Sequence, residues 1–145
     1  MQKEIARFLV GLSIILLAPS SLAQSTVELG GSISMGEGDL GIEGISVSDN
    51  HDLILAHGSN SGIFLVDSNS PENNSNIEWN GGYSLLDSSF HPGGETAIMV
   101  GDGGNVLRLT LANSSIEQAG SASTFGDTLL TSVSWNGDGS WAYIG

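Results

Sequence analysis

Histidine, serine and carboxylate side chains are the residues of this sequence that could act in catalysis. The chain has 3 His and no Cys, which excludes a thiolate mechanism. No serine lies in the Gly-x-Ser-x-Gly turn that holds the nucleophile of α/β-hydrolases. His51, His57 and His91 lack the i, i+4 helical spacing of a zinc site. We interpret His51 and His91 as turn residues and His57 as a structural residue at a strand end, so no catalytic residue is assigned.

The carboxylates leave two kinds of site open. Any two of the 16 Asp and Glu residues could meet as the acid pair of a glycoside hydrolase, although their number alone is not evidence. Oxygen-rich stretches at Asp49–Asp52, Asp67–Asn69 and Asp102–Asn105 are of a kind that can bind calcium. None completes an EF-hand loop, and Asp and Asn also favour turns. We therefore expect no cofactor or metal, with calcium as the one alternative.

Aromatic side chains could form a surface on which a carbohydrate stacks. The residues in question are Trp79, Tyr83, Phe90, Trp135 and Trp141. Phe90 and Trp135, however, occupy matching positions in an internal repeat. Packing in a core is therefore the interpretation we prefer for them.

That repeat organises the chain. Val47, Phe90 and Trp135 are equivalent strand ends, spaced by 43 and 45 residues. These intervals fall within the roughly 40–50 residues of a propeller blade. Each strand end is followed by a turn rich in Gly, Asp, Asn or Pro, which favours a sharp reversal of the chain. The repeat predicts an architecture but no reaction.

Short runs of apolar residues between these turns predict an all-β fold of four-stranded antiparallel blades. No run keeps a 3.6-residue period, so we expect no helix beyond the leader. The strands expected after the first strand of each unit are Leu53–His57, Gly62–Val66, Thr96–Val100, Asn105–Leu111 and Trp141–Ile144. Outer strands are expected at Val27–Gly31, Ile77–Gly81 and Ile116–Gly120.

The amino-terminal residues resemble a secretory signal peptide. Lys3 and Arg7 precede the apolar run Phe8–Ala18, and small residues suit cleavage between Ala23 and Gln24. The alternative is an uncleaved membrane anchor, but the apolar run is shorter than the roughly 20 residues that a bilayer requires. We expect a secreted or extracytoplasmic protein without a stable membrane span after cleavage.

The net charge of the chain limits the classes of partner that it could bind. Removing Lys3, Glu4 and Arg7 changes the formal charge from −13 to −14 and leaves Arg108 as the one basic residue apart from histidine. Phosphate binding requires Lys or Arg, so nucleic acid is not an expected partner. A saline environment would suit such a surface, but keeping a glycine-rich secreted protein soluble is the simpler explanation.

The turn sequences resemble the WD-repeat-like β-propeller superfamily. Phe90–Gly94 and Trp135–Ser140 are similar to its turn between first and second strands, and Val100–Leu109 to its next turn and third strand. Leu109-Thr110 and Val66-Asp67 stand where a true WD repeat carries Trp-Asp. The resemblance implies a rigid platform for proteins or other ligands, and occasionally an enzyme.

The resulting domain organisation is a partial propeller. We expect a signal peptide (1–23), an outer strand of the closing blade plus linker (24–39), blade 1 (40–82), blade 2 (83–127) and the start of blade 3 (128–145). Four to eight blades need roughly 170–350 residues, so we interpret the chain as the amino-terminal fragment of a longer protein.

The function we expect is non-enzymatic binding of a protein or extracellular ligand. The alternative is an extracellular hydrolase of glycans or peptides whose catalytic residues lie beyond residue 145. Glu43, Asp87 and Ser132 are the candidates for lining the channel of the propeller. Asn73 and Asn113 begin Asn-x-Ser triplets and are possible glycosylation sites on exposed loops.

Overall fold

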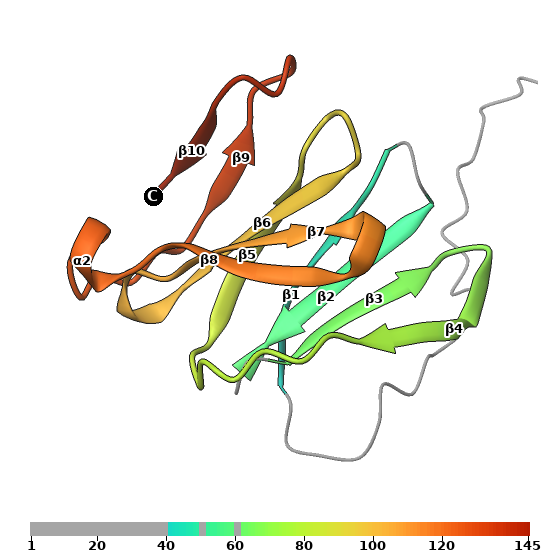
Figure 1. Ribbon diagram of the computed structural model, residues 1–145, viewed down its shortest axis with the longest axis horizontal. Helices are drawn as coiled ribbons and strands as arrows, with labels where there is room; N and C mark the ends of the chain where they lie inside the picture. The colour runs from blue at the N-terminus through green and yellow to red at the C-terminus, as the bar shows by residue number, and fades with distance from the viewer. Residues whose placement is uncertain (1–40, 50–51, 60–61) are drawn as a thin grey trace, which may run out of the picture. The chain divides into compact units, whose positions relative to one another are not determined.

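Antiparallel strands dominate the computed structural model, which describes residues 41–49, 52–59 and 62–145. The predicted leader, its cleavage site, the strand Val27–Gly31 and the turn residue His51 lie outside the described residues. All described residues belong to one compact unit of the chain. They form two four-stranded sheets and one two-stranded sheet, in chain order (Figure 1). The predicted all-β class with four-stranded antiparallel sheets is confirmed.

The strands follow one another in space as they do in sequence. The first sheet has the order β1-β2-β3-β4: β1 (Ile42–Val47), β2 (Leu53–Gly58), β3 (Ile63–Asp67) and β4 (Ser70–Asn76). The second has the order β5-β6-β7-β8: β5 (Leu85–Phe90), β6 (Thr96–Gly101), β7 (Val106–Thr110) and β8 (Ser115–Gly120). The third pairs β9 (Val133–Trp135) with β10 (Ala142–Ile144).

The sequence repeat has a backbone counterpart. The N–H groups of Ser48, His91 and Asn136 each donate to the carbonyl five residues further along, at 2.8, 2.9 and 2.9 Å. The spacing of these three donors is the 43 and 45 residues of the sequence repeat. The three turns between first and second strands are therefore structurally equivalent.

Glycine recurs at the end of the second strand of each four-stranded sheet, at Gly58 and Gly101. A Cβ atom on Gly58 would lie 1.7 Å from the carbonyl oxygen of Gly41, and one on Gly101 would lie 1.9 Å from that of Ser84. No side chain fits at either position, because another segment of backbone passes directly against it. The recurrence of glycine here reflects this close approach.

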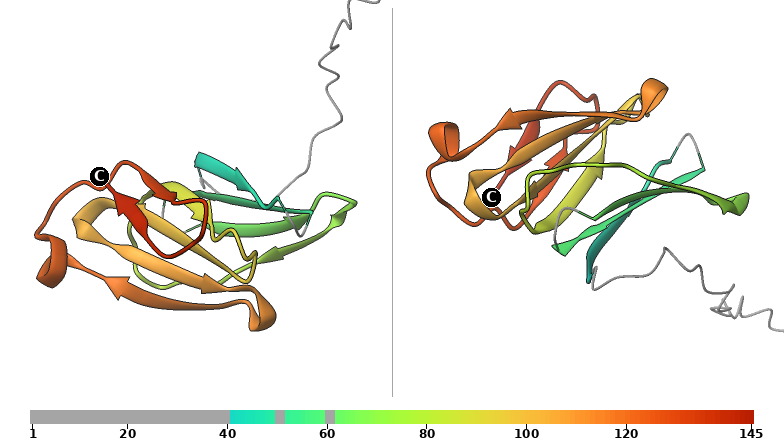
Figure 2. Two further views of the ribbon diagram at one scale, coloured as in Figure 1. Left: turned by 90° about the horizontal axis from the view of Figure 1, so that it is seen from above. Right: turned by 60° about the horizontal axis from the view of Figure 1, so that its bottom comes forward.

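The core lies between the sheets. In β6, Ala97 and Met99 belong to the cluster shared with the first sheet, whereas Ile98 and Val100 belong to the cluster shared with the third sheet. Alternate residues of a strand point to opposite faces, so β6 is covered on both. β9 contacts β5 and β6 of the second sheet, as two further views show (Figure 2).

The outer strand of the first sheet lies earlier than predicted. The sequence indicated Ile77–Gly81, but β4 is the polar segment Ser70–Asn76. An edge strand can face solvent and needs no apolar residues, so the apolar pattern was a poor guide there. Ile77 donates its N–H to the carbonyl of Ile63 at 2.8 Å and buries its side chain in the core. The predicted outer strand Ile116–Gly120 is confirmed as β8.

The sequence predicted no helix beyond the leader, but the described ranges contain short helices. The α-helix α2 (Ala122–Phe125) follows β8, and 3₁₀ turns occur at η2 (Asp102–Gly104) and η3 (Leu111–Asn113). The hydroxyl of Ser121 accepts from the N–H of Ser123 at 3.3 Å, which caps α2. Single turns of this length leave no 3.6-residue period in the sequence.

Candidate ligand-binding pocket

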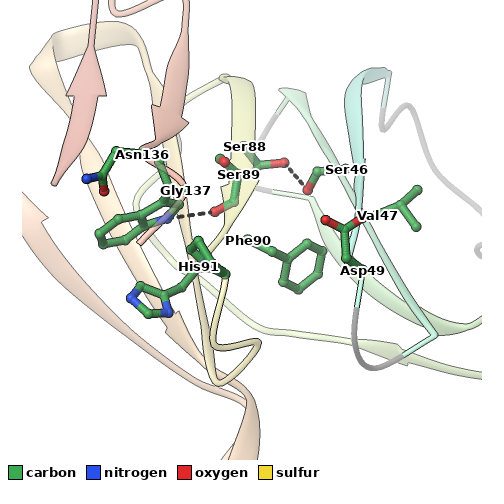
Figure 3. A pocket seen from close by; sticks show the side chains of 11 residues that line it. Ser46, Val47, Asp49, Ser88, Ser89, Phe90, His91, Asn136 and Gly137 are labelled. Carbon is green, nitrogen blue, oxygen red and sulfur yellow. Dashed lines mark hydrogen bonds between the residues drawn. The ribbon is translucent and has the colours of Figure 1, made fainter. Parts of the chain in front are cut away.

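A pocket of about 380 Å³ lies where the first strands of the three sheets end. β1 and its turn contribute Ser46 and Asp49, β5 and its turn contribute Ser88, Phe90 and His91, and β9 contributes Trp135. In Figure 3, Phe90 lies between His91 and Asp49. The equivalent turns of the repeat thus meet at one site.

Hydrogen bonds join neighbouring first strands along the wall of this pocket. The hydroxyl groups of Ser46 and Ser88 are 2.7 Å apart, which links β1 to β5. The indole N–H of Trp135 donates to the carbonyl of Ser89 at 3.3 Å, which links β9 to β5. Both contacts are drawn in Figure 3. The wall is therefore held in place across both sheet boundaries.

His91 is fixed by its own turn. Its Nδ1 accepts from the N–H of Gly93 at 2.9 Å, so the ring proton is on Nε2, which donates to the carbonyl of Gly139 at 3.1 Å. The imidazole also meets the Trp135 ring edge to face, with centroids 4.7 Å apart. Both ring nitrogens are committed, which confirms His91 as a turn residue and leaves it without a free lone pair for proton abstraction.

Asp49 is the carboxylate of the pocket. Among the residues that the structure describes, no hydrogen-bond donor or basic group contacts it. Arg108 and Glu117, on β7 and β8, form the one ion pair of the described ranges. The side chain of Asp49 is exposed and has no partner within the described ranges.

His57 is a second titratable group that the fold isolates. The residue is 1% exposed, and its Nδ1 lies 3.0 Å from the carbonyl oxygen of Leu85 in the second sheet. Nε2 is buried without a partner in the described part of the chain. Burial lowers the pKa of His57, and the Leu85 carbonyl, Asp87 and Glu43 oppose that shift. His57 thus acts as a neutral link between the first two sheets.

The three predicted channel residues lie outside the pocket lining. Asp87 accepts a hydrogen bond at 2.8 Å from the N–H of Val133, and so joins the second sheet to the third. Glu43 is exposed on β1, and its charge acts on His57. Ser132 is exposed, and its backbone pairs with Gly145.

The predicted glycosylation sites are both on the surface. Asn73 is exposed on β4, an edge strand of the first sheet rather than the expected loop. Asn113 is exposed at the end of η3, where its Oδ1 accepts from the N–H of Ser115 at 3.2 Å. Their modification stays a prediction.

Carboxylates of two oxygen-rich stretches accept backbone hydrogen bonds that hold loops in place. Asp67 accepts from the N–H of Asn69 at 2.8 Å, and Asp102 accepts from that of Ser84 at 3.1 Å. Within residues 41–49, 52–59 and 62–145, no three His, Asp or Glu side chains gather as a metal ion would require. Nor does any helix of these ranges have the length and apolarity to cross a membrane.

Sequence reasoning did not select the serines and Asp49 of the pocket. Asp49 attracted notice only as part of a possible calcium stretch. The signal that could have found the site was the alignment itself, since the three turns that it makes equivalent meet at one pocket. Comparison with known proteins adds no further guide: neither a protein-family model nor a curated protein matches the chain.

Proposed function

We propose that the chain is part of a secreted, non-enzymatic β-propeller of the WD-repeat-like kind, which binds an extracellular protein or other ligand at one rim. The observation that carries this proposal is the convergence of three equivalent turns on one pocket, with their first strands linked side by side. Binding sites occur preferentially on loops that a rigid framework positions.

The arrangement of the sheets supports the propeller part of the proposal. The second sheet packs against a neighbour on each face, and equivalent glycines and turns recur at the same register. Such stacking of repeated units in chain order is what a radial array of blades requires. Closure of the ring is a further expectation of the proposal.

The pocket chemistry favours binding over turnover. His91, the histidine of the site, has both nitrogens engaged, and the hydroxyl groups of Ser46 and Ser88 contact each other rather than a base. Activation of a serine requires a base within hydrogen-bond reach. A wall held by such bonds reduces the ordering cost of recognition.

The test is to express the whole chain with its leader in a secreting host and to probe the exported protein with immobilised glycans and peptides. The proposal expects retention of one class of ligand and an amino terminus at Gln24. Bound ligand should slow amide exchange at turns 91–95 and 136–140 and leave β6 and β7 nearly unchanged.

Paired tryptophan variants localise the binding. Trp135→Leu in the pocket should abolish retention, whereas Trp141→Leu, at a residue 70% exposed outside the pocket lining, should not. Thermal melting checks that both variants fold. Turnover of a glycoside or peptide by the purified protein would contradict the non-enzymatic role.

A further inference from the structure

We infer that the pocket binds a cationic side chain, an arginine or lysine presented by a basic segment of a partner protein. This inference rests on the proposed function of the same site and specifies the chemistry of its ligand.

The hydrogen-bonding inventory of the pocket is the first argument. The N–H groups of Trp135 and His91 already donate within the wall. The side-chain amide of Asn136 donates to Asp138 and Ser140 in its own turn. What is left for a ligand is the Asp49 carboxylate, the hydroxyl groups of Ser46 and Ser88, which share one hydrogen bond, and the hydroxyl of Ser89, so the one charged group of the set is an acceptor. Ammonium and guanidinium groups are donors without acceptors, so they match this set.

Aromatic faces are the second argument. Phe90 and Trp135 line the pocket and are both partly buried. The face of an aromatic ring attracts a cation through its quadrupole, and arginine is the commonest cation in such contacts. A divalent metal ion would find one carboxylate in the lining where several oxygen ligands are needed.

Charge complementarity indicates a basic segment rather than a single small amine. The turns that follow the first strands carry further carboxylates, at Asp52, Glu95 and Asp138, which do not line the pocket itself. Arg108, the one Lys or Arg of the described ranges, lies on β7 and pairs with Glu117. A partner with several cations would interact with the rim beyond the pocket, whereas an isolated amine would contact the pocket alone.

The experiment titrates the exported full chain by calorimetry with four probes: capped arginine, a capped tri-arginine peptide, its citrulline counterpart and spermidine. Citrulline has nearly the shape of arginine without its charge. We expect the tri-arginine peptide to bind at least tenfold more tightly than the citrulline peptide and spermidine. Its affinity should also fall with added NaCl, since salt screens the attraction.

Two variants that remove the same charge test whether the tri-arginine peptide binds at the pocket. Asp49→Asn removes the pocket carboxylate and should weaken tri-arginine binding at least tenfold. Asp127→Asn makes the same change of charge at an exposed residue outside the pocket and should weaken it less than twofold. Because Asp49 has no contact to lose in the described part of the chain, its variant should melt with the wild type.

Three results would overturn the inference: no binding of either arginine probe, equal losses in the two variants, or equal affinity for the citrulline peptide. Spermidine binding as tightly as tri-arginine would overturn the choice of a protein segment as occupant. None of these results would change the amide-exchange pattern at the turns or the absence of turnover, which are the tests of the proposed function. The proposed function is therefore tested separately from this inference.

Discussion

His57 carries the pH response that the fold predicts at the level of a single residue. Burial lowers its pKa from an ordinary value of 6.5, against the opposing effects of the Leu85 carbonyl, Asp87 and Glu43. The unfolded chain therefore binds a proton at a higher pH than the folded protein does. Stability then falls as the pH falls through about 6.5 and is fully present above it.

We predict a drop in the free energy of unfolding between pH 7 and pH 5, measured by urea denaturation at each pH. His57→Asn keeps a donor that can reach the carbonyl of Leu85 but does not titrate, so it should flatten this part of the profile. An unchanged slope in His57→Asn would rule out His57 as the source.

Glycine at the end of the second strand of each four-stranded sheet sets how closely another backbone segment can approach, which is a feature of whole elements. We predict that Gly101→Ala destabilises the protein by about 2–4 kcal/mol, because its Cβ would overlap the Ser84 carbonyl oxygen at 1.9 Å. Gly137→Ala is the matched control, since nothing lies within 4 Å of its Cβ. The control should cost less than about 0.5 kcal/mol in the same denaturation experiment.

Packing between the first two sheets gives a second prediction at this scale. Leu107 of β7 is fully buried in their shared cluster. Leu107→Ala should cost about 2–5 kcal/mol, from lost burial and the cavity left behind. Leu129→Ala, at a residue 57% exposed, should cost far less. Similar losses at the two positions would mean that the sheets do not share the packed core described above.

Strand β5 departs from the regular alternation of side chains because its pairing with β6 is irregular. Strict alternation would place Leu86, Ser88 and Phe90 on one face of the strand, with Leu85 and Asp87 on the other. The register shifts between Leu85 and Asp87, and Leu85 and Ser88 are both buried. A bulge adds one residue to the strand and moves the alternation out of phase. The same shift occurs between Ile42 and Gly44 of β1.

Charge is the property of the whole molecule with a direct consequence for stability. The chain carries a formal charge of −13, and like charges repel more strongly in the compact state than in the expanded one. Raising NaCl from 0.01 to 0.15 M shortens the Debye length from about 30 to about 8 Å. We predict a higher midpoint of urea unfolding at the higher salt concentration.

Sucrose at matched osmolality is the control for that measurement, because it stabilises proteins without screening charge. The salt effect should shrink at pH 4, where many carboxylates are protonated. A midpoint that does not move with salt at pH 7 would show that self-repulsion contributes little to the stability of this protein.

Local chemistry was enough to predict the strands and their repeat. Apolar alternation and turn residues act over a few positions, so β6, β7 and β8 could be placed to within about a residue from the sequence. The polar strand β4 and the four-residue helix α2 escaped prediction, because neither leaves a periodic apolar signal.

By itself, the amino-acid sequence determined an all-β chain of repeated antiparallel units, together with its acidity. The tertiary structure alone decided that Asp49 meets Phe90 and Trp135 in one pocket and that His57 is sealed between two sheets. The physical reason is the distance along the sequence over which each kind of interaction acts. Strand and turn preferences arise among neighbouring residues, whereas a pocket or a buried imidazole depends on contacts between segments about 30 to 90 residues apart in the sequence.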